Sequence, residues 1–110
     1  MSLPETYKAI VGNEKGEISI KEFSLPQPTE NQVLVKVEFA PLNPTDFMKI
    51  NGFYGKPADY GTALHGSEGS GVVVAVGTDL KYSFKIGDRV HIWGESWGQY
   101  VLTESENISH

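Results

Sequence analysis

The chain has 110 residues, of which 39% are hydrophobic and 21% are charged, with no cysteine and a net charge of −5 at pH 7. This composition predicts one small globular domain, and the absence of cysteine excludes a disulfide framework and thiolate chemistry. A negative charge without a run of Lys or Arg argues against nucleic acid or an anionic membrane as a partner. No stretch approaches the roughly 18 apolar residues of a spanning helix, and the N-terminus lacks a secretory signal, so we expect a cytoplasmic protein.

The first third of the chain predicts β-strands separated by turns. Residues 7–11 form a short strand candidate, and residues 12–16 have the composition of a turn. Ile18 and Ile20 then alternate with polar neighbours, which predicts a half-buried hairpin. Residues 32–40 give the clearest strand pattern, because Val33, Val35, Val37 and Phe39 fall on one face.

The segment after this strand predicts a short helix followed by a loop. Asn43 suits the N-cap, Pro44 suits the first helical position, and Asp46 places a negative charge in the first turn. Residues 51–64 contain three glycines and one proline and are too interrupted for a regular element. We expect an exposed loop there, of the kind that lines functional sites.

A glycine cluster at positions 66, 69 and 71 precedes an apolar run at residues 72–76, which predicts a strand buried on both faces. A dinucleotide loop needs G-x-G-x-x-G after a strand and at the start of a helix, whereas these glycines are spaced G-x-x-G-x-G and lead into a strand. Residues 89–93 and 99–102 predict the last strands. The chain thus has about six strands, mostly antiparallel, and one short helix, which indicates a mainly β fold, a small and partly open β-barrel.

Several motifs together carry a family resemblance. The run from Gly66 to Gly77, followed by Gly87-Asp88-Arg89-Val90, resembles the catalytic-domain signature of the medium-chain dehydrogenase/reductase superfamily. Residues 40–46 and 51–55 look like its zinc-free branch, the quinone oxidoreductases and enoyl-thioester reductases, and residues 97–101 look like the strand that follows. The resemblance extends from about Lys8 to the C-terminus and implies a GroES-like barrel over residues 1–110.

In the family that the chain resembles, a Rossmann domain follows this barrel and a final segment completes the catalytic domain. The sequence ends at His110 and has no G-x-G-x-x-G after a strand. We therefore expect an N-terminal piece that lacks the Rossmann domain and is inactive alone, with any homo-oligomer forming through the missing domain.

The resemblance also implies site residues. In the enoyl-thioester reductases a tyrosine in the loop matching Tyr54 donates a proton to the substrate, whereas the alternative is that Tyr54 only packs the loop. Asn43 and Asp46 border the nicotinamide by resemblance, and the alternative for Asn43 is a simple helix cap. Glu68 is expected to brace the glycine turn. Trp93 and Trp97 either line a substrate cleft or pack at strand ends.

A metal site is not expected. Zinc-dependent relatives have a cysteine at the position of Asn43 and a histidine at the position of Ser67, and neither an amide nor a hydroxyl is a good zinc ligand. The resemblance thus implies a zinc-independent, NADP(H)-dependent oxidoreductase that reduces a small molecule, either a quinone or an α,β-unsaturated carbonyl or thioester. The alternative is a free-standing GroES- or OB-like barrel that binds a partner without catalysis.

Overall fold

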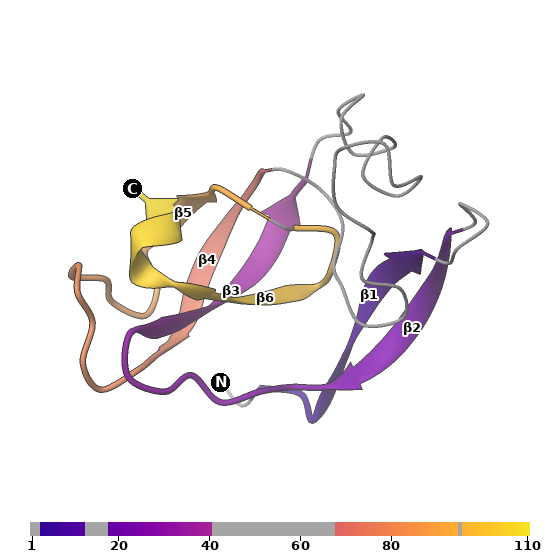
Figure 1. Cartoon of the computed structure of the whole chain (residues 1–110), viewed down its shortest axis with the longest axis horizontal. Helices are drawn as coiled ribbons and strands as arrows, with labels where there is room; N and C mark the ends of the chain where they lie inside the picture. The colour runs from indigo at the N-terminus through magenta and orange to yellow at the C-terminus, as the bar shows by residue number, and fades with distance from the viewer. Residues whose placement is uncertain (1–2, 13–17, 41–67, 95) are drawn as a thin grey trace.

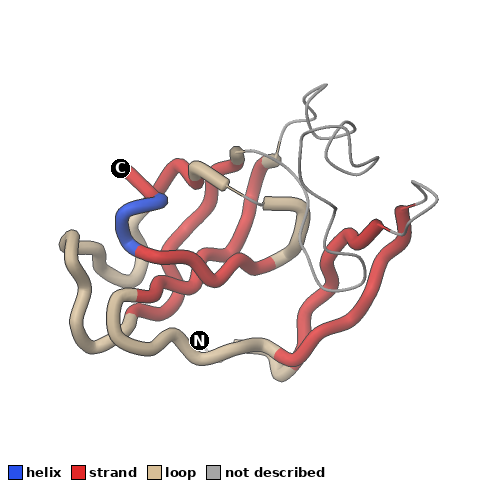
Figure 2. Tube along the Cα trace, in the orientation of Figure 1, coloured by secondary structure: helices blue, strands red, loops and turns tan. Residues whose placement is uncertain are grey.

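The computed structural model describes residues 3–12, 18–40, 68–94 and 96–110, and these are mainly β (Figure 1). The predicted strands are confirmed, with bounds that differ by a few residues (Figure 2). The strands are β1 Thr6–Gly12, β2 Ile18–Ser24, β3 Gln32–Phe39, β4 Gly69–Val76, β5 Arg89–Ile92, β6 Tyr100–Glu104 and β7 Ile108–Ser109. A 3₁₀-helix at Ser105–Asn107 was not predicted, and the helix predicted at Asn43 lies outside the described residues.

The strands form a five-stranded antiparallel sheet and a separate hairpin. The sheet has the order β6-β3-β4-β5-β7, and β1 pairs with β2. Figure 1 shows that the sheet curls and that the hairpin stands to one side of it. The predicted fold class, a small, partly open β-barrel, is therefore confirmed.

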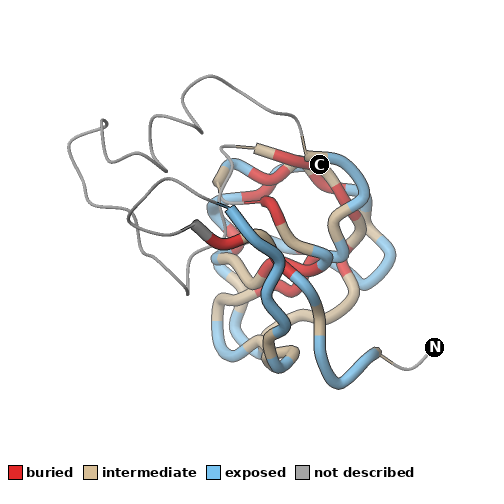
Figure 3. Tube along the Cα trace, turned by 90° about the vertical axis from the view of Figure 1, so that its right-hand side faces the viewer, coloured by how far each residue is buried: buried red, intermediate tan, exposed pale blue. Residues whose placement is uncertain are grey.

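The hydrophobic core lies inside the curled sheet (Figure 3). It is built from one set of buried side chains: Val33, Val35, Val73, Phe84, Val90, Ile92 and Ile108. Burial depends on position along β3 as well as on its faces, because Leu34 is also buried whereas Phe39 is 65% exposed. The prediction that residues 72–76 are buried on both faces was wrong, since only Val73 among them is fully buried.

The hairpin pairs as predicted but is buried differently. Ala9 and Val11 of β1 are buried, whereas Ile18 and Ile20 of β2 are 51% and 71% exposed. The alternation of Ile18 and Ile20 therefore predicted a strand correctly and its buried face wrongly. These two exposed isoleucines leave an apolar surface on β2.

Strand β1 joins the hairpin to the main sheet. The backbone N–H of Ile10 donates to the Trp97 carbonyl (2.8 Å), and the N–H of Gln99 donates to the Lys8 carbonyl (2.9 Å). The Gln99 side chain also accepts a hydrogen bond from the Lys8 N–H (2.8 Å). These bonds place β1 next to the residues that lead into β6.

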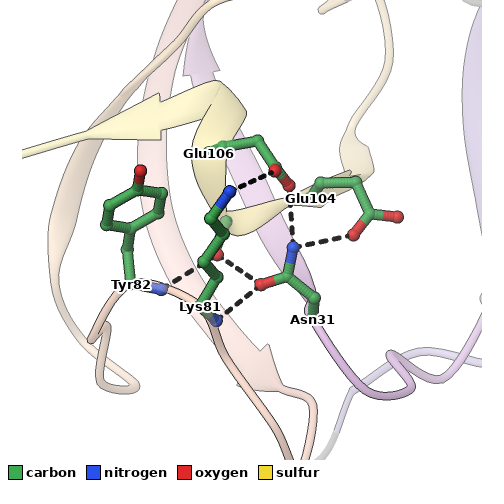
Figure 4. Close-up of polar contacts among 6 residues, drawn as sticks. Asn31, Lys81, Tyr82, Glu104 and Glu106 are labelled. Carbon is green, nitrogen blue, oxygen red and sulfur yellow. Dashed lines mark hydrogen bonds and ion pairs between the residues drawn. The ribbon is translucent and has the colours of Figure 1, made fainter.

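A polar network centred on Asn31 fixes the opposite end of the sheet (Figure 4). The Asn31 amide donates to Glu104 (3.0 Å) and Glu106 (2.7 Å), and its oxygen accepts from the Lys81 N–H (2.7 Å) and from the Ser105 hydroxyl. One side chain thus ties together the turn before β3, the loop after β4 and the 3₁₀-helix. No sequence pattern indicated this role.

The glycine cluster permits close contact between β4 and β3. A Cβ on Gly71 would lie 2.1 Å from the Lys36 carbonyl oxygen and 2.9 Å from Val35 Cγ1. The two strands therefore approach closely at Gly71, whose φ is not positive, whereas Gly87 takes a positive φ (97°). Gly71 is therefore required because of space.

We predict that Gly71→Val lowers the free energy of unfolding by ~2–4 kcal/mol, because its side chain would overlap the β3 backbone. Denaturant unfolding measures the loss. Gly71→Ala and Gly94→Ala form a matched pair, since a Cβ at Gly94 meets nothing within 4 Å. An unchanged midpoint for Gly71→Val, or equal losses in the alanine pair, would contradict this packing account.

The tight turn before β5 is held by Asp88. Its carboxylate accepts the Lys85 N–H (2.9 Å), and Gly87 takes the left-handed conformation. The hydrogen bond from Lys85 and then the contact with His110 lower the pKa of Asp88. Because the folded-state pKa is depressed, the stabilisation is present above the unfolded-state pKa of about 3.9 and is lost as the pH falls through the folded-state pKa.

We predict that wild type melts at a higher temperature than Asp88→Asn at pH 7, and that the difference disappears as the pH falls from about 4 towards 2. Thermal unfolding across this pH range measures the effect. Asp79→Asn removes the same charge from the preceding loop and serves as the control. A difference between wild type and Asp88→Asn that stays constant over the range would rule out a charge-dependent turn.

Candidate active site

The sequence-predicted site residues belong to one segment. Tyr54, Asn43, Asp46 and Ser67 all lie outside the described residues, and their predicted roles remain predictions. The structure does describe the two ends of the segment that carries them. Phe39 at the end of β3 pairs with Ser70 near the start of β4. The segment therefore leaves β3 and enters β4 at the same end of this strand pair.

An open cavity of about 460 Å³ lies at this end of the β3–β4 pair. Its walls come from β1, β2, the end of β3 and the residues before β6. Most wall side chains are apolar: Ala9, Ile10, Ile20, Val37, Phe39 and Trp97. Lys8, Glu38, Ser96 and Gln99 supply the polar groups. The expectation that Trp97 lines a cleft is consistent with this geometry, whereas Trp93, which follows β5, packs against His91 and is not among the cavity walls.

The size and lining of the cavity suit a small apolar molecule, because small-molecule sites have volumes of about 300–1,000 Å³ and mostly apolar walls. Sequence analysis missed the contributions of Ile20 and Phe39. Both are exposed apolar residues on strands that otherwise alternate, and exposure cannot be read from the alternation itself.

The described glycines do not form a site for a dinucleotide phosphate. Gly69 and Gly71 lie within β4, and the space where their side chains would be is filled by the carbonyls of Phe39 and Lys36. A phosphate loop instead leaves its N–H groups open at a helix N-terminus. Gly69 and Gly71 therefore do not form a binding site for the pyrophosphate of a nicotinamide cofactor.

Glu68 marks the point where the chain enters β4. Its carbonyl accepts a hydrogen bond from Ser96, which is fully buried (2.5 Å). Its carboxylate lies 3.8 Å from His91 Nε2. The expected bracing by Glu68 thus has contacts that could support it, one through the backbone and one through the side chain.

Within the described ranges, no group of three or more His, Cys, Asp or Glu side chains is arranged to hold a metal ion. The same part of the chain contains no helix long and apolar enough to cross a membrane. The predicted positions that match zinc ligands, Asn43 and Ser67, lie outside it.

The chain is similar in sequence to a known domain family and to curated proteins. The alcohol dehydrogenase GroES-like domain model matches residues 29–109. Trans-enoyl reductase RAP2 of Pyricularia oryzae is 37% identical over 82% of this chain and 24% of its own length. Alcohol dehydrogenase 2 of Caenorhabditis elegans is 33% identical over 83% of this chain and 26% of its own length. The chain thus spans about a quarter of the length of these curated relatives.

A solved structure supports the same assignment. The putative NADPH:quinone reductase of Mesorhizobium loti superposes with a TM-score of 0.79 at 28% identity, covering 99% of this chain and 37% of that protein. Sequence motifs, sheet topology and family model agree over most of the chain. The chain belongs to the alcohol dehydrogenase GroES-like domain family of the medium-chain dehydrogenase/reductase superfamily.

Proposed function

We propose that the chain forms the N-terminal part of the catalytic domain of a zinc-independent, NADP(H)-dependent reductase. Its substrate is a quinone or an α,β-unsaturated carbonyl or thioester. The observation that carries the proposal is the apolar cavity at the end of the β3–β4 pair. The segment that contains Asn43, Asp46 and Tyr54 leaves β3 at this end. A relative named as a trans-enoyl reductase and a structural neighbour named as an NADPH:quinone reductase support this substrate class.

The proposed roles follow the chemistry of reduction of a conjugated carbonyl. The cofactor supplies a hydride when bound. Tyr54 donates a proton, because a phenol keeps its proton at neutral pH and its hydrogen bond stabilises a developing enolate. Asn43 and Asp46 orient the nicotinamide ring. Gly69 and Gly71 do not form a site for the pyrophosphate, and in this proposal a Rossmann domain in a longer polypeptide binds it.

Zinc independence is part of the same proposal. It is supported by the amide at position 43 and the hydroxyl at position 67, which replace the thiolate and imidazole of zinc-dependent relatives. The complete absence of cysteine also removes the ligands of the structural zinc site of those relatives.

A second candidate function is a barrel that binds a partner without catalysis. The exposed Ile18 and Ile20 on β2 favour it, because exposed apolar residues on an edge strand can contact another chain. The gene beyond His110 distinguishes the two. A strand, a glycine-rich turn and a helix there would support the reductase, whereas a stop codon directly after His110 would support the binding module.

We predict that Tyr54→Phe, in the longer polypeptide, lowers turnover about a hundredfold and leaves the affinity for NADPH nearly unchanged, because it removes a proton donor used in the transition state and keeps the ring. Steady-state kinetics with an enone, an enoyl thioester and a quinone measure the effect.

Tyr82→Phe is the matched control for this experiment. Tyr82 is half exposed on the loop after β4 and is not among the cavity walls. The substitution therefore removes the same hydroxyl group at a position away from the cavity. Wild-type turnover of Tyr54→Phe on every substrate tested would show that Tyr54 only packs.

A further inference from the structure

One buried nitrogen in the sheet has no hydrogen-bond partner. Among the described residues, His91 Nε2 is the side-chain polar atom that is buried without a partner. Leaving a buried donor or acceptor unpaired is destabilising, so such an atom in a folded protein needs an explanation. His91 lies in β5, where it faces Ser70 of β4 and Ser109 of β7.

A carboxylate lies just beyond hydrogen-bond distance of this nitrogen. Glu68 Oε1 lies 3.8 Å from His91 Nε2, about 1 Å beyond the length of a charge-assisted hydrogen bond. The Glu68 side chain is 41% exposed, so a small rotation can close this gap. The other charged group on this face of β5, Arg89, already pairs with Glu38 at 2.9 Å.

Trp93 packs against the His91 ring and is itself 60% exposed. Its ring lies 4.1 Å from the His91 ring, and it is held there by two hydrogen bonds, from its indole N–H to the Ser109 hydroxyl (3.1 Å) and from its backbone N–H to the Asn107 carbonyl (2.8 Å). A hydrogen bond to an ionised carboxylate is stronger than one between two neutral groups. The geometry therefore favours a bond between His91 and Glu68.

We propose that His91 is a positioning residue whose Nε2–H donates to the Glu68 carboxylate and thereby fixes the junction where the segment 41–67 enters β4. Ser96 donates a hydrogen bond to the Glu68 carbonyl, and a Cβ at Gly69 would meet the Phe39 carbonyl and Ser96 at 2.8 Å. The junction is then fixed by backbone, side chain and packing together. Its importance for turnover rests on the proposed function, because that segment carries Tyr54.

Imidazole ¹H–¹⁵N spectra of the 110-residue chain test the bond. We expect a slowly exchanging proton on Nε2 of His91 in wild type and in Glu68→Gln, whose side-chain oxygen can still accept. The same proton should exchange rapidly in Glu68→Ala. His110 is the internal control, because it pairs with Asp88 (3.0 Å) and should give the same signals in all three proteins. A His91 proton carried on Nδ1, or exchange equally slow in Glu68→Ala, would overturn the proposal.

Kinetics of the longer polypeptide test the positioning role separately. His91→Phe should lower kcat about tenfold with an unchanged KM for NADPH, because a displaced catalytic group costs rate rather than cofactor binding. His91→Gln, which keeps a donor, should restore most of the loss. Equal turnover in wild type and His91→Phe would remove the role in catalysis. A wild type that reduces none of the substrates would overturn the proposed function, while the spectra would still decide the hydrogen bond.

Discussion

The contact between β3 and β4 at Gly71 is the constraint on which the rest of the structure depends. The Lys36 carbonyl lies where a side chain of residue 71 would be, so the two strands approach closely. Val35 and Val73, which pair across this contact, are both fully buried in the core. Strands β5 and β6 then extend the sheet on either side, and the curled sheet encloses the core.

This constraint also determines where the candidate site lies. Because β3 and β4 are antiparallel neighbours, the segment that leaves β3 and enters β4 begins and ends at the same end of this strand pair. At that end of the strand pair, Ser96 is packed against Gly69, lines the cavity and donates a hydrogen bond to the Glu68 carbonyl. The same close packing that stabilises the barrel thus anchors the segment on which the predicted chemistry depends.

Much of the fold could be predicted from the sequence, because the periodicity of residues 32–40 and the glycines before Val72 are local signals. The exposure of Ile18 and Ile20 could not, since it depends on what the hairpin packs against. The Asn31 network could not be predicted from the sequence, because it joins segments more than 70 residues apart. The cavity was likewise formed by residues distant in sequence, and for Tyr54, Asn43 and Asp46 only the family motifs carried the inference.

Amide hydrogen exchange of the 110-residue chain tests most directly whether the β3–β4 contact is the stable centre of the fold. Amides in the most stable unit exchange only by global unfolding, whereas peripheral elements also open locally. The account predicts the slowest exchange at Lys36 and Val72, which pair across β3 and β4, and exchange at least about tenfold faster at Ile20 of the hairpin. Equal or slower exchange at Ile20 would contradict the central place of this contact.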